Sequence, residues 1–154
     1  MLLPYHAGII VEDIDRSIRE LQDRLGYTFN SPTTLPIPQL DDRLTGRSEP
    51  IDLVASYTRE GPFRLEVIQG QGDGVYSKDL AGLHHLGVWD SDVEARLAQL
   101  EADGELIDAV IRRGDGTISA IYSRSSRTGT RIEYVNDDRR SQLEHWFNTG
   151  QMPT

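Results

Sequence analysis

Short segments in which hydrophobic and polar residues alternate are the main pattern along this chain, and they predict strands. Residues 5–11 alternate in this way and are rich in Ile and Val, as is typical of a strand. The residues that follow are apolar at every third or fourth position, which predicts a helix capped by Asp13 and ended by Gly26. Its apolar stripe consists of Ile14, Ile18, Leu21 and Leu25.

The segment of residues 31–50 departs from this pattern because it contains the prolines Pro32, Pro36, Pro38 and Pro50. Proline cannot donate to a strand ladder, so we expect an irregular loop here. Loops of this kind either form lids and substrate walls or cross an edge of the fold. Strands resume at residues 51–58 and 63–69, and the turn between them predicts a hairpin.

The second half of the chain repeats the first half. An offset of 79 residues superposes two His-x-Gly motifs, which begin at His6 and His85. An offset of 67 residues superposes Glu66 and Glu133, each within an apolar strand. Each half therefore begins with a histidine and ends with a glutamate, and the chain is a tandem repeat.

The predicted elements of the second half follow the same order. A strand at residues 83–89 precedes a helix that begins at Asp90 or Ser91 and ends at Gly104. Three further strands are predicted at residues 105–112, 117–123 and 130–135. Each half is thus a strand, a helix and three strands.

We expect a single domain over residues 1–154, made of two repeats at about 4–72 and 82–136. Modules of this size are each too small to be secure alone, so they should share one core. We interpret the glycine-rich residues 70–74 as a linker between them. Residues 137–147 predict a short C-terminal helix, with its inward face formed by Leu143, Trp146 and Phe147.

A duplicated module of this kind, opened by His-x-Gly and closed by a glutamate in an apolar strand, resembles the vicinal oxygen chelate superfamily. That superfamily includes glyoxalase I, methylmalonyl-CoA epimerase, extradiol dioxygenases and bleomycin-binding proteins. The resemblance covers Tyr5 to Asn136, and the run Gly-Leu-His-His at residues 82–85 is most similar to the epimerase branch. It implies an α+β fold in which two tandem βαβββ modules form a curved, mostly antiparallel eight-stranded sheet around a cleft, with helices on the outside.

The resemblance also implies one divalent metal ion in the cleft, bound by His6, Glu66, His85 and Glu133. Independently of it, two histidines and two glutamates at equivalent positions of a repeat are difficult to obtain from surface patterning. A carboxylate in a half-buried strand costs several kcal/mol unless a cation or a strong donor accompanies it. Imidazole and carboxylate ligands without thiolate suit Zn, Ni, Co, Mn or Fe(II). Because neighbours on a strand face opposite sides, His84 should face away from His85.

By resemblance, the protein is a metal-dependent isomerase, epimerase or lyase of the glyoxalase type. Such an enzyme deprotonates the carbon next to a metal-bound carbonyl and forms an enediolate, and its substrate is a small molecule with neighbouring oxygens. Glu133 and Glu66 are the candidate catalytic residues, and Glu133 could leave the metal to act as the base.

Two alternatives stay open at this point. An extradiol-type Fe(II) dioxygenase would leave the position of Glu66 unligated, so Glu66 argues against it. A metal-free, bleomycin-resistance-like protein would sequester a drug or another small apolar molecule between the subunits of a homodimer. The aromatic residues that could line its pocket are Tyr57, Trp89, Tyr122 and Tyr134.

Composition narrows the partners. A formal net charge of -9 disfavours binding to nucleic acid or to an anionic membrane surface, because both need clustered basic residues. The absence of cysteine excludes disulfides and thiolate ligands, and no apolar run approaches the length of a membrane span, so we expect a cytoplasmic protein. The arginines Arg124, Arg127 and Arg131 either receive an anionic group of a substrate or balance nearby carboxylates.

Overall fold

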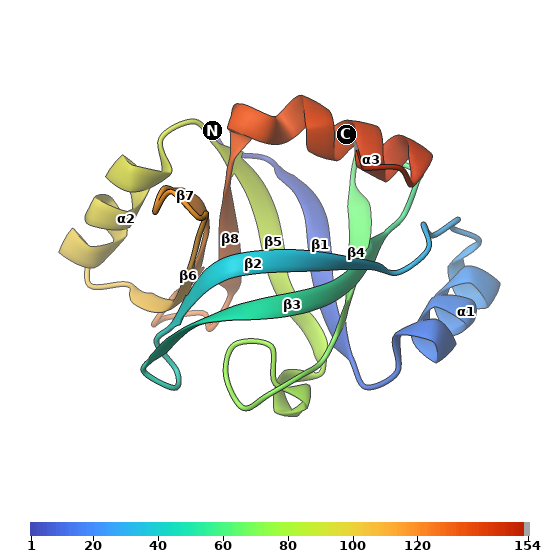
Figure 1. Cartoon of the computed structure of the whole chain (residues 1–154), viewed down its shortest axis with the longest axis horizontal. Helices are drawn as coiled ribbons and strands as arrows, with labels where there is room; N and C mark the ends of the chain where they lie inside the picture. The colour runs from blue at the N-terminus through green and yellow to red at the C-terminus, as the bar shows by residue number, and fades with distance from the viewer. Residues whose placement is uncertain (153–154) are drawn as a thin grey trace.

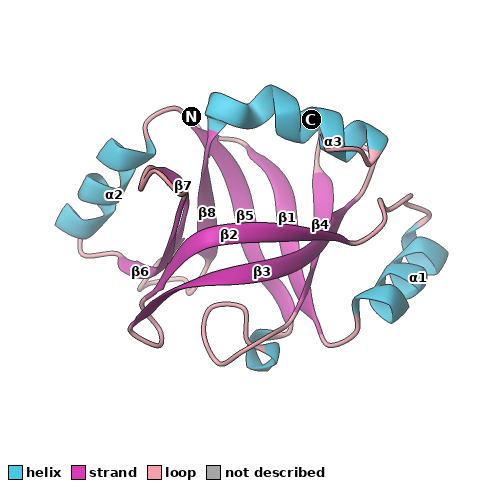
Figure 2. Cartoon of the chain, in the orientation of Figure 1, coloured by secondary structure: helices cyan, strands magenta, loops and turns pink. Residues whose placement is uncertain are grey.

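The computed structural model describes residues 1–152, whose strands close into one barrel with helices on its outside (Figures 1 and 2). The strands are β1 Pro4–Val11, β2 Thr33–Asp42, β3 Arg47–Tyr57, β4 Arg64–Gln69, β5 Gly82–Asp90, β6 Leu106–Arg112, β7 Ile118–Arg124 and β8 Arg131–Asn136. The helices are α1 Ile14–Leu25, α2 Val93–Ala102 and α3 Arg140–Thr149. The predicted α+β class, with an eight-stranded curved sheet and outer helices, is confirmed.

The barrel has the strand order β1-β4-β3-β2-β6-β7-β8-β5, so the two modules meet along two seams. At one seam the first strands of the modules, β1 and β5, pair antiparallel. At the other seam β2 pairs with β6 over residues 39–42, which closes the sheet. Among the strands of residues 1–152, only β1 with β4 and β5 with β8 are parallel pairs, so the predicted mostly antiparallel sheet is confirmed.

The proline-rich segment is regular structure, and the prediction of an irregular loop at residues 31–50 was wrong. It forms β2 and the first part of β3, which pair as an antiparallel hairpin. The register of this pair shifts between Ile37 and Leu40, where Pro38 lies. Because β2 pairs with β6 only from Gln39 onward, Pro36 and Pro38 lie where one side of the strand needs no ladder donor.

The caps of α1 agree with the sequence, whereas its apolar stripe is shorter than predicted. The Asp13 carboxylate accepts a hydrogen bond from the Arg16 amide at 3.0 Å, and Gly26 adopts the left-handed conformation that ends the helix. Leu25 is 55% exposed, so the stripe ends one turn earlier. The cap of α2 is Asp92 rather than Asp90 or Ser91, since its carboxylate accepts from the Ala95 amide.

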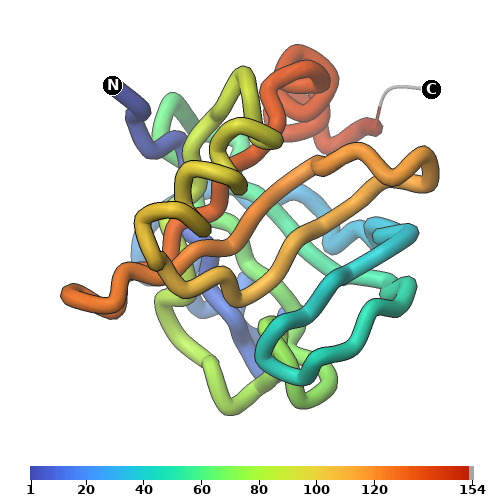
Figure 3. Tube along the Cα trace, turned by 90° about the vertical axis from the view of Figure 1, so that its left-hand side faces the viewer, coloured from blue at the N-terminus to red at the C-terminus, as the bar shows by residue number. Residues whose placement is uncertain are grey.

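Both ends of the barrel are covered (Figure 1). Helix α3 crosses one end and inserts Trp146 and Phe147, as predicted. The segment between β4 and β5 crosses the opposite end, where Val75 and Tyr76 join the core cluster inside the barrel. Residues 70–74 therefore lead into a plug of the barrel and are more than a linker. Figure 3 shows the same chain from the side of α2. Within residues 1–152, no helix has the length and apolarity needed to span a bilayer.

Candidate metal centre

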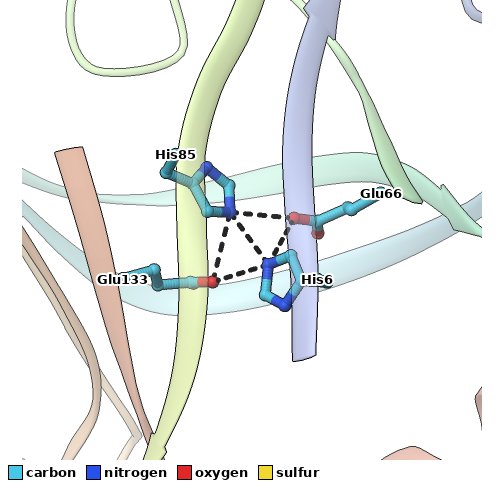
Figure 4. Close-up of side chains that lie close together, drawn as sticks. All are labelled: His6, Glu66, His85 and Glu133. Carbon is cyan, nitrogen blue, oxygen red and sulfur yellow. Dashed lines mark hydrogen bonds and ion pairs between the residues drawn. The ribbon is translucent and has the colours of Figure 1, made fainter. Parts of the chain in front are cut away.

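The four residues predicted as metal ligands meet inside the barrel (Figure 4). They come from the neighbouring strands β4-β1-β5-β8, in the order Glu66, His6, His85 and Glu133. None of the four is more than 8% exposed. The two imidazole Nε2 atoms are 2.9 Å apart, and each lies 3.2 or 3.3 Å from Oε2 of both glutamates.

Gly8 and Gly87 make room for the two imidazole rings. In the strand register each glycine lies opposite one histidine and one glutamate of the site. A methyl group on Gly8 would overlap the ring of His85, and one on Gly87 would overlap the ring of His6. The His-x-Gly motif of each module therefore supplies one candidate ligand and the space for the ligand of the other module.

The arrangement fits a shared cation better than hydrogen bonds among the side chains. Within residues 1–152, Oε2 of Glu66 is buried and has no aligned hydrogen-bond donor. Ligand atoms bonded to one ion at about 2.0–2.2 Å lie about 3 Å from one another. The separations of 2.9–3.3 Å observed here match that spacing. Two imidazoles and two carboxylates could therefore hold a divalent ion of the kind that N and O ligands prefer.

The charges of the site are coupled. Burial alone would raise the pKa of Glu66, but the adjacent imidazoles outweigh it and lower this pKa to about 2. The pKa of Glu133 is also lowered, by the same imidazoles against the effect of burial. Burial alone would lower the pKa of His85, but the two carboxylates raise it to about 9, and the same balance raises the pKa of His6. The four side chains thus favour positive charge at the point where they meet.

His84 is buried beside His85, and the prediction that it faces away was wrong. The pairing of β1 with β5 places Gly8 opposite His85 but Ile9 opposite Leu83, which marks a β-bulge at His84. His84 is 4% exposed, and its Nδ1 lies 2.9 Å from Nδ1 of His85. Burial, helped by the nearby charge of His85, lowers the pKa of His84 to about 3 and keeps it neutral. The sequence signal for its position was the His84-His85 doublet. The rule that neighbouring strand residues face opposite sides does not hold across a bulge.

A family model described as the Glyoxalase/Bleomycin resistance protein/Dioxygenase superfamily matches residues 5–122. The chain belongs to this superfamily. The resemblance inferred from the repeated motifs is thereby confirmed. No curated protein sequence matches the chain significantly.

Solved structures of two methylmalonyl-CoA epimerases and of a hypothetical protein share the fold. A variant of Streptomyces coelicolor methylmalonyl-CoA epimerase in complex with 2-nitronate-propionyl-CoA superposes with a TM-score of 0.58 at 18% identity, over 88% of this chain and 95% of that chain. Methylmalonyl-CoA epimerase from Mycobacterium tuberculosis gives 0.58 at 19% identity, over 86% of each chain. A hypothetical protein from Bacillus halodurans gives 0.55 at 15% identity, over 88% of this chain and 94% of that chain. At these identities the likeness shows the fold alone.

Two of the four aromatic residues considered for a binding pocket lie beside the candidate ligands His6 and His85. The ring of Tyr57 is centred 5.5 Å from that of His6, and the ring of Tyr122 is 5.1 Å from that of His85. Burial raises the pKa of both hydroxyls well above the usual value, so both stay protonated. The other two lie away from the site: Trp89 stacks on Tyr5, and Tyr134 packs against α2.

The arginine cluster balances a buried carboxylate. Asp108 on β6 accepts hydrogen bonds from Arg124 at 3.0 Å and from Arg131 at 2.8 Å. Burial alone would raise the pKa of Asp108, but the two arginines lower it. Arg127 lies exposed in the hairpin between β7 and β8. The geometry of Arg124 and Arg131 thus favours charge balance over substrate binding.

Proposed function

We propose that this protein is a divalent-metal-dependent epimerase or isomerase that removes and returns a proton on carbon next to a carbonyl group. The convergence of two imidazoles and two carboxylates to separations of 2.9–3.3 Å in the barrel interior carries the proposal. Membership of the superfamily and a fold shared with methylmalonyl-CoA epimerases support it.

A divalent cation held by His6, Glu66, His85 and Glu133 would act as a Lewis acid on a substrate carbonyl and make the neighbouring C–H more acidic. The two glutamates lie on the outer strands of the four, β4 and β8, and so approach the histidine pair from opposite sides (Figure 4). Their lowered pKa values keep both carboxylates ionised at neutral pH, the form in which a carboxylate binds a metal ion. An epimerase needs an ionised carboxylate that takes the proton on one face of the carbon and a protonated carboxyl group that returns a proton on the other face. We assign these two positions to Glu133 and Glu66, which exchange roles with the direction of the reaction.

The enclosure of the site restricts the reacting end of the substrate. A cavity of about 640 Å³ reaches the barrel at Tyr5 and Phe147. The ring of Tyr5, which lines this cavity, is centred 4.4 Å from that of His6. We place the approach of the substrate here, with Tyr5 and α3 moving aside on binding.

Elemental analysis and proton exchange test this function. The purified protein should contain one divalent ion per chain, and it should exchange deuterium from D₂O into the α-carbon of a substrate without oxygen uptake. A panel of CoA thioesters, hemithioacetals and α-hydroxy ketones identifies the substrate class. Glu133→Gln should abolish exchange, whereas His145→Gln, at an exposed histidine of α3, should leave it unchanged.

Other results of the same experiments assign other functions. Oxygen consumption with a catechol-like substrate would favour a dioxygenase. A protein that binds no metal but retains an apolar ligand would favour the sequestering protein, for which Tyr57 and Tyr122 beside the histidines are the structural support. We also expect this protein to form a homodimer. This stays a prediction, which the mass measured by light scattering tests.

A further inference from the structure

His84 is hydrogen-bonded at both ring nitrogens. Its Nε2 lies 2.8 Å from the carbonyl oxygen of Val75, and its Nδ1 lies 2.9 Å from Nδ1 of His85. A carbonyl oxygen can only accept, so Nε2 of His84 carries a hydrogen. In a neutral imidazole the other nitrogen then has a lone pair, and Nδ1 of His84 must accept from Nδ1–H of His85. A neutral His85, the form that binds a metal ion, then has its lone pair on Nε2, the atom that faces the other candidate ligands.

The carbonyl that anchors this chain of hydrogen bonds is itself fixed. The amide of Val75 donates to Oδ2 of Asp42 at 2.7 Å, and Oδ1 of Asp42 accepts from the Leu44 amide at 3.0 Å. Gly74 permits this contact, because a methyl group there would overlap the Asp42 carboxylate. The backbone of Val75 is therefore held at its amide by Asp42 and at its carbonyl by His84, at the end of the barrel opposite α3.

The first module has no counterpart of this support. Within residues 1–152, Nδ1 of His6 is buried without a hydrogen-bond partner. The residue before it, Tyr5, contributes an aromatic contact to the His6 ring but no hydrogen bond. The two histidines that the repeat makes equivalent thus differ in what orients them.

We propose that His84 is a positioning residue, which, anchored on Val75, holds His85 as the tautomer with its Nε2 lone pair directed at the metal. The inference rests on the proposed metal-dependent function, because it assigns His84 to the support of that same site. Outer partners of this kind commonly change metal affinity by about 10- to 100-fold. The segment between β4 and β5 thereby becomes part of the metal centre.

Nitrogen NMR of the imidazoles tests the hydrogen-bond chain directly. In protein labelled with ¹⁵N-histidine, two-bond ¹H–¹⁵N correlations should show His84 with a protonated Nε2 and an unprotonated Nδ1, with or without metal. In the Zn-loaded protein His85 should be protonated at Nδ1. A His84 that carries its proton on Nδ1 would overturn the proposal, even if the protein binds metal.

Metal affinity, measured by competition with a chromophoric chelator for Zn²⁺ and Co²⁺, tests the consequence. His84→Phe should weaken binding at least tenfold, and His84→Asn, whose amide oxygen can accept from His85, should restore most of it. Tyr76→Phe is the matched control, since it removes a buried hydroxyl beside His84 but leaves the imidazole chain intact, and it should change affinity less than about twofold.

The outcomes separate this proposal from the proposed function. If His84→Phe binds metal as tightly as the unmodified protein, His84 is not a positioning residue, and the metal function stands. If the unmodified protein binds none of Zn²⁺, Co²⁺, Mn²⁺ and Ni²⁺, the proposed function falls, and the proposal falls with it whatever the NMR shows of the hydrogen bonds. If His84→Phe fails to fold, the comparison of His84→Asn with Tyr76→Phe and the Co²⁺ absorption spectrum of each decide the matter.

Discussion

The two modules place their candidate ligands alike but support them differently. In both, a His-x-Gly motif on the first strand and a glutamate on the last strand reach the same point, and each glycine accommodates the histidine of the other module. Within residues 1–152, Nδ1 of His85 is hydrogen-bonded to His84, whereas Nδ1 of His6 has no partner. Duplication therefore accounts for the geometry of the site, whereas the hydrogen bonds that support the two histidines differ between the halves.

The arginines that precede the two glutamates show the same contrast. Arg64 donates to the backbone carbonyl of Thr58 and to the side chain of Asn148 on α3. Arg131, at the equivalent position, pairs with Asp108. The first module is thus tied to the C-terminal helix, and the second module is stabilised by a charge pair within its own strands.

The largest expected effect comes from filling the reciprocal glycine positions. Gly8→Ala and Gly87→Ala each drive a methyl group into a buried imidazole ring, and both should prevent metal binding and destabilise the fold by about 3 kcal/mol or more. Thermal unfolding and metal analysis measure the two effects. Gly114→Ala, where nothing lies within 4 Å of the added carbon, is the control. A large difference between Gly8→Ala and Gly87→Ala would contradict the symmetry of the ligand geometry.

The next effect separates the two arginine environments. Asp108→Ala removes the buried partner of Arg131 and should lower the free energy of unfolding by about 3 kcal/mol. The reason is that breaking a buried ion pair leaves the remaining charge buried and unpaired. Asn148→Ala removes one hydrogen bond to Arg64 at an exposed residue and should cost about 1 kcal/mol. Urea denaturation of both variants gives the free energies of unfolding. Equal losses would show that the two modules are stabilised in the same way.

The pH dependence of the free energy of unfolding should distinguish metal-free from metal-loaded protein. The folded-state pKa of His85, about 9, exceeds its ordinary value of 6.5, so folding favours the protonated form. This stabilisation is complete below about pH 6.5 and is lost as the pH rises to about 9, at up to about 1.4 kcal/mol per unit of pKa difference. Metal-free protein should therefore lose stability over this range while its affinity for Zn²⁺ increases. A flat stability curve for the metal-free protein would show that the imidazoles are not holding these protons.

The smallest effect is expected at the exposed arginine of the β7–β8 hairpin. Arg127→Ala should change the free energy of unfolding by less than about 0.5 kcal/mol and leave proton exchange unaltered, because surface residues without specific contacts contribute little. Denaturation and the deuterium assay measure both quantities. A loss of substrate affinity in this variant would revive the interpretation of the cluster as an anion site.

The sequence was sufficient to predict which four candidate ligands meet, but it was not sufficient to predict the contacts around them. The repeat placed His6 with His85 and Glu66 with Glu133, because equivalent residues of a duplicated fold occupy equivalent positions. It could not show the bulge that turns His84 toward His85, since strand alternation assumes an unbroken register. The proline content of residues 31–50 also led to the wrong prediction of an irregular loop. Proline is tolerated on the unpaired side of a strand and at a register shift.

The closure of the barrel was not visible in the sequence either. The pairing of Gln39 with Arg112 that joins β2 to β6 links residues of different modules, and no periodicity reports which edges meet. The plug formed by Val75 and Tyr76 follows a glycine-rich stretch whose composition resembles a flexible linker. Such contacts depend on the whole fold and become apparent only in three dimensions.

The central claim is that a divalent cation joins the four buried side chains, and metal stoichiometry tests it most directly. Protein purified without chelator, then dialysed against Zn²⁺, Co²⁺, Mn²⁺ or Ni²⁺, should bind one ion per chain. Glu66→Gln and Glu133→Gln should each weaken that binding more than about 100-fold, beyond the range typical of outer-shell changes. Stoichiometric binding that survives in both variants, or no binding of any of these ions by the unmodified protein, would contradict the account.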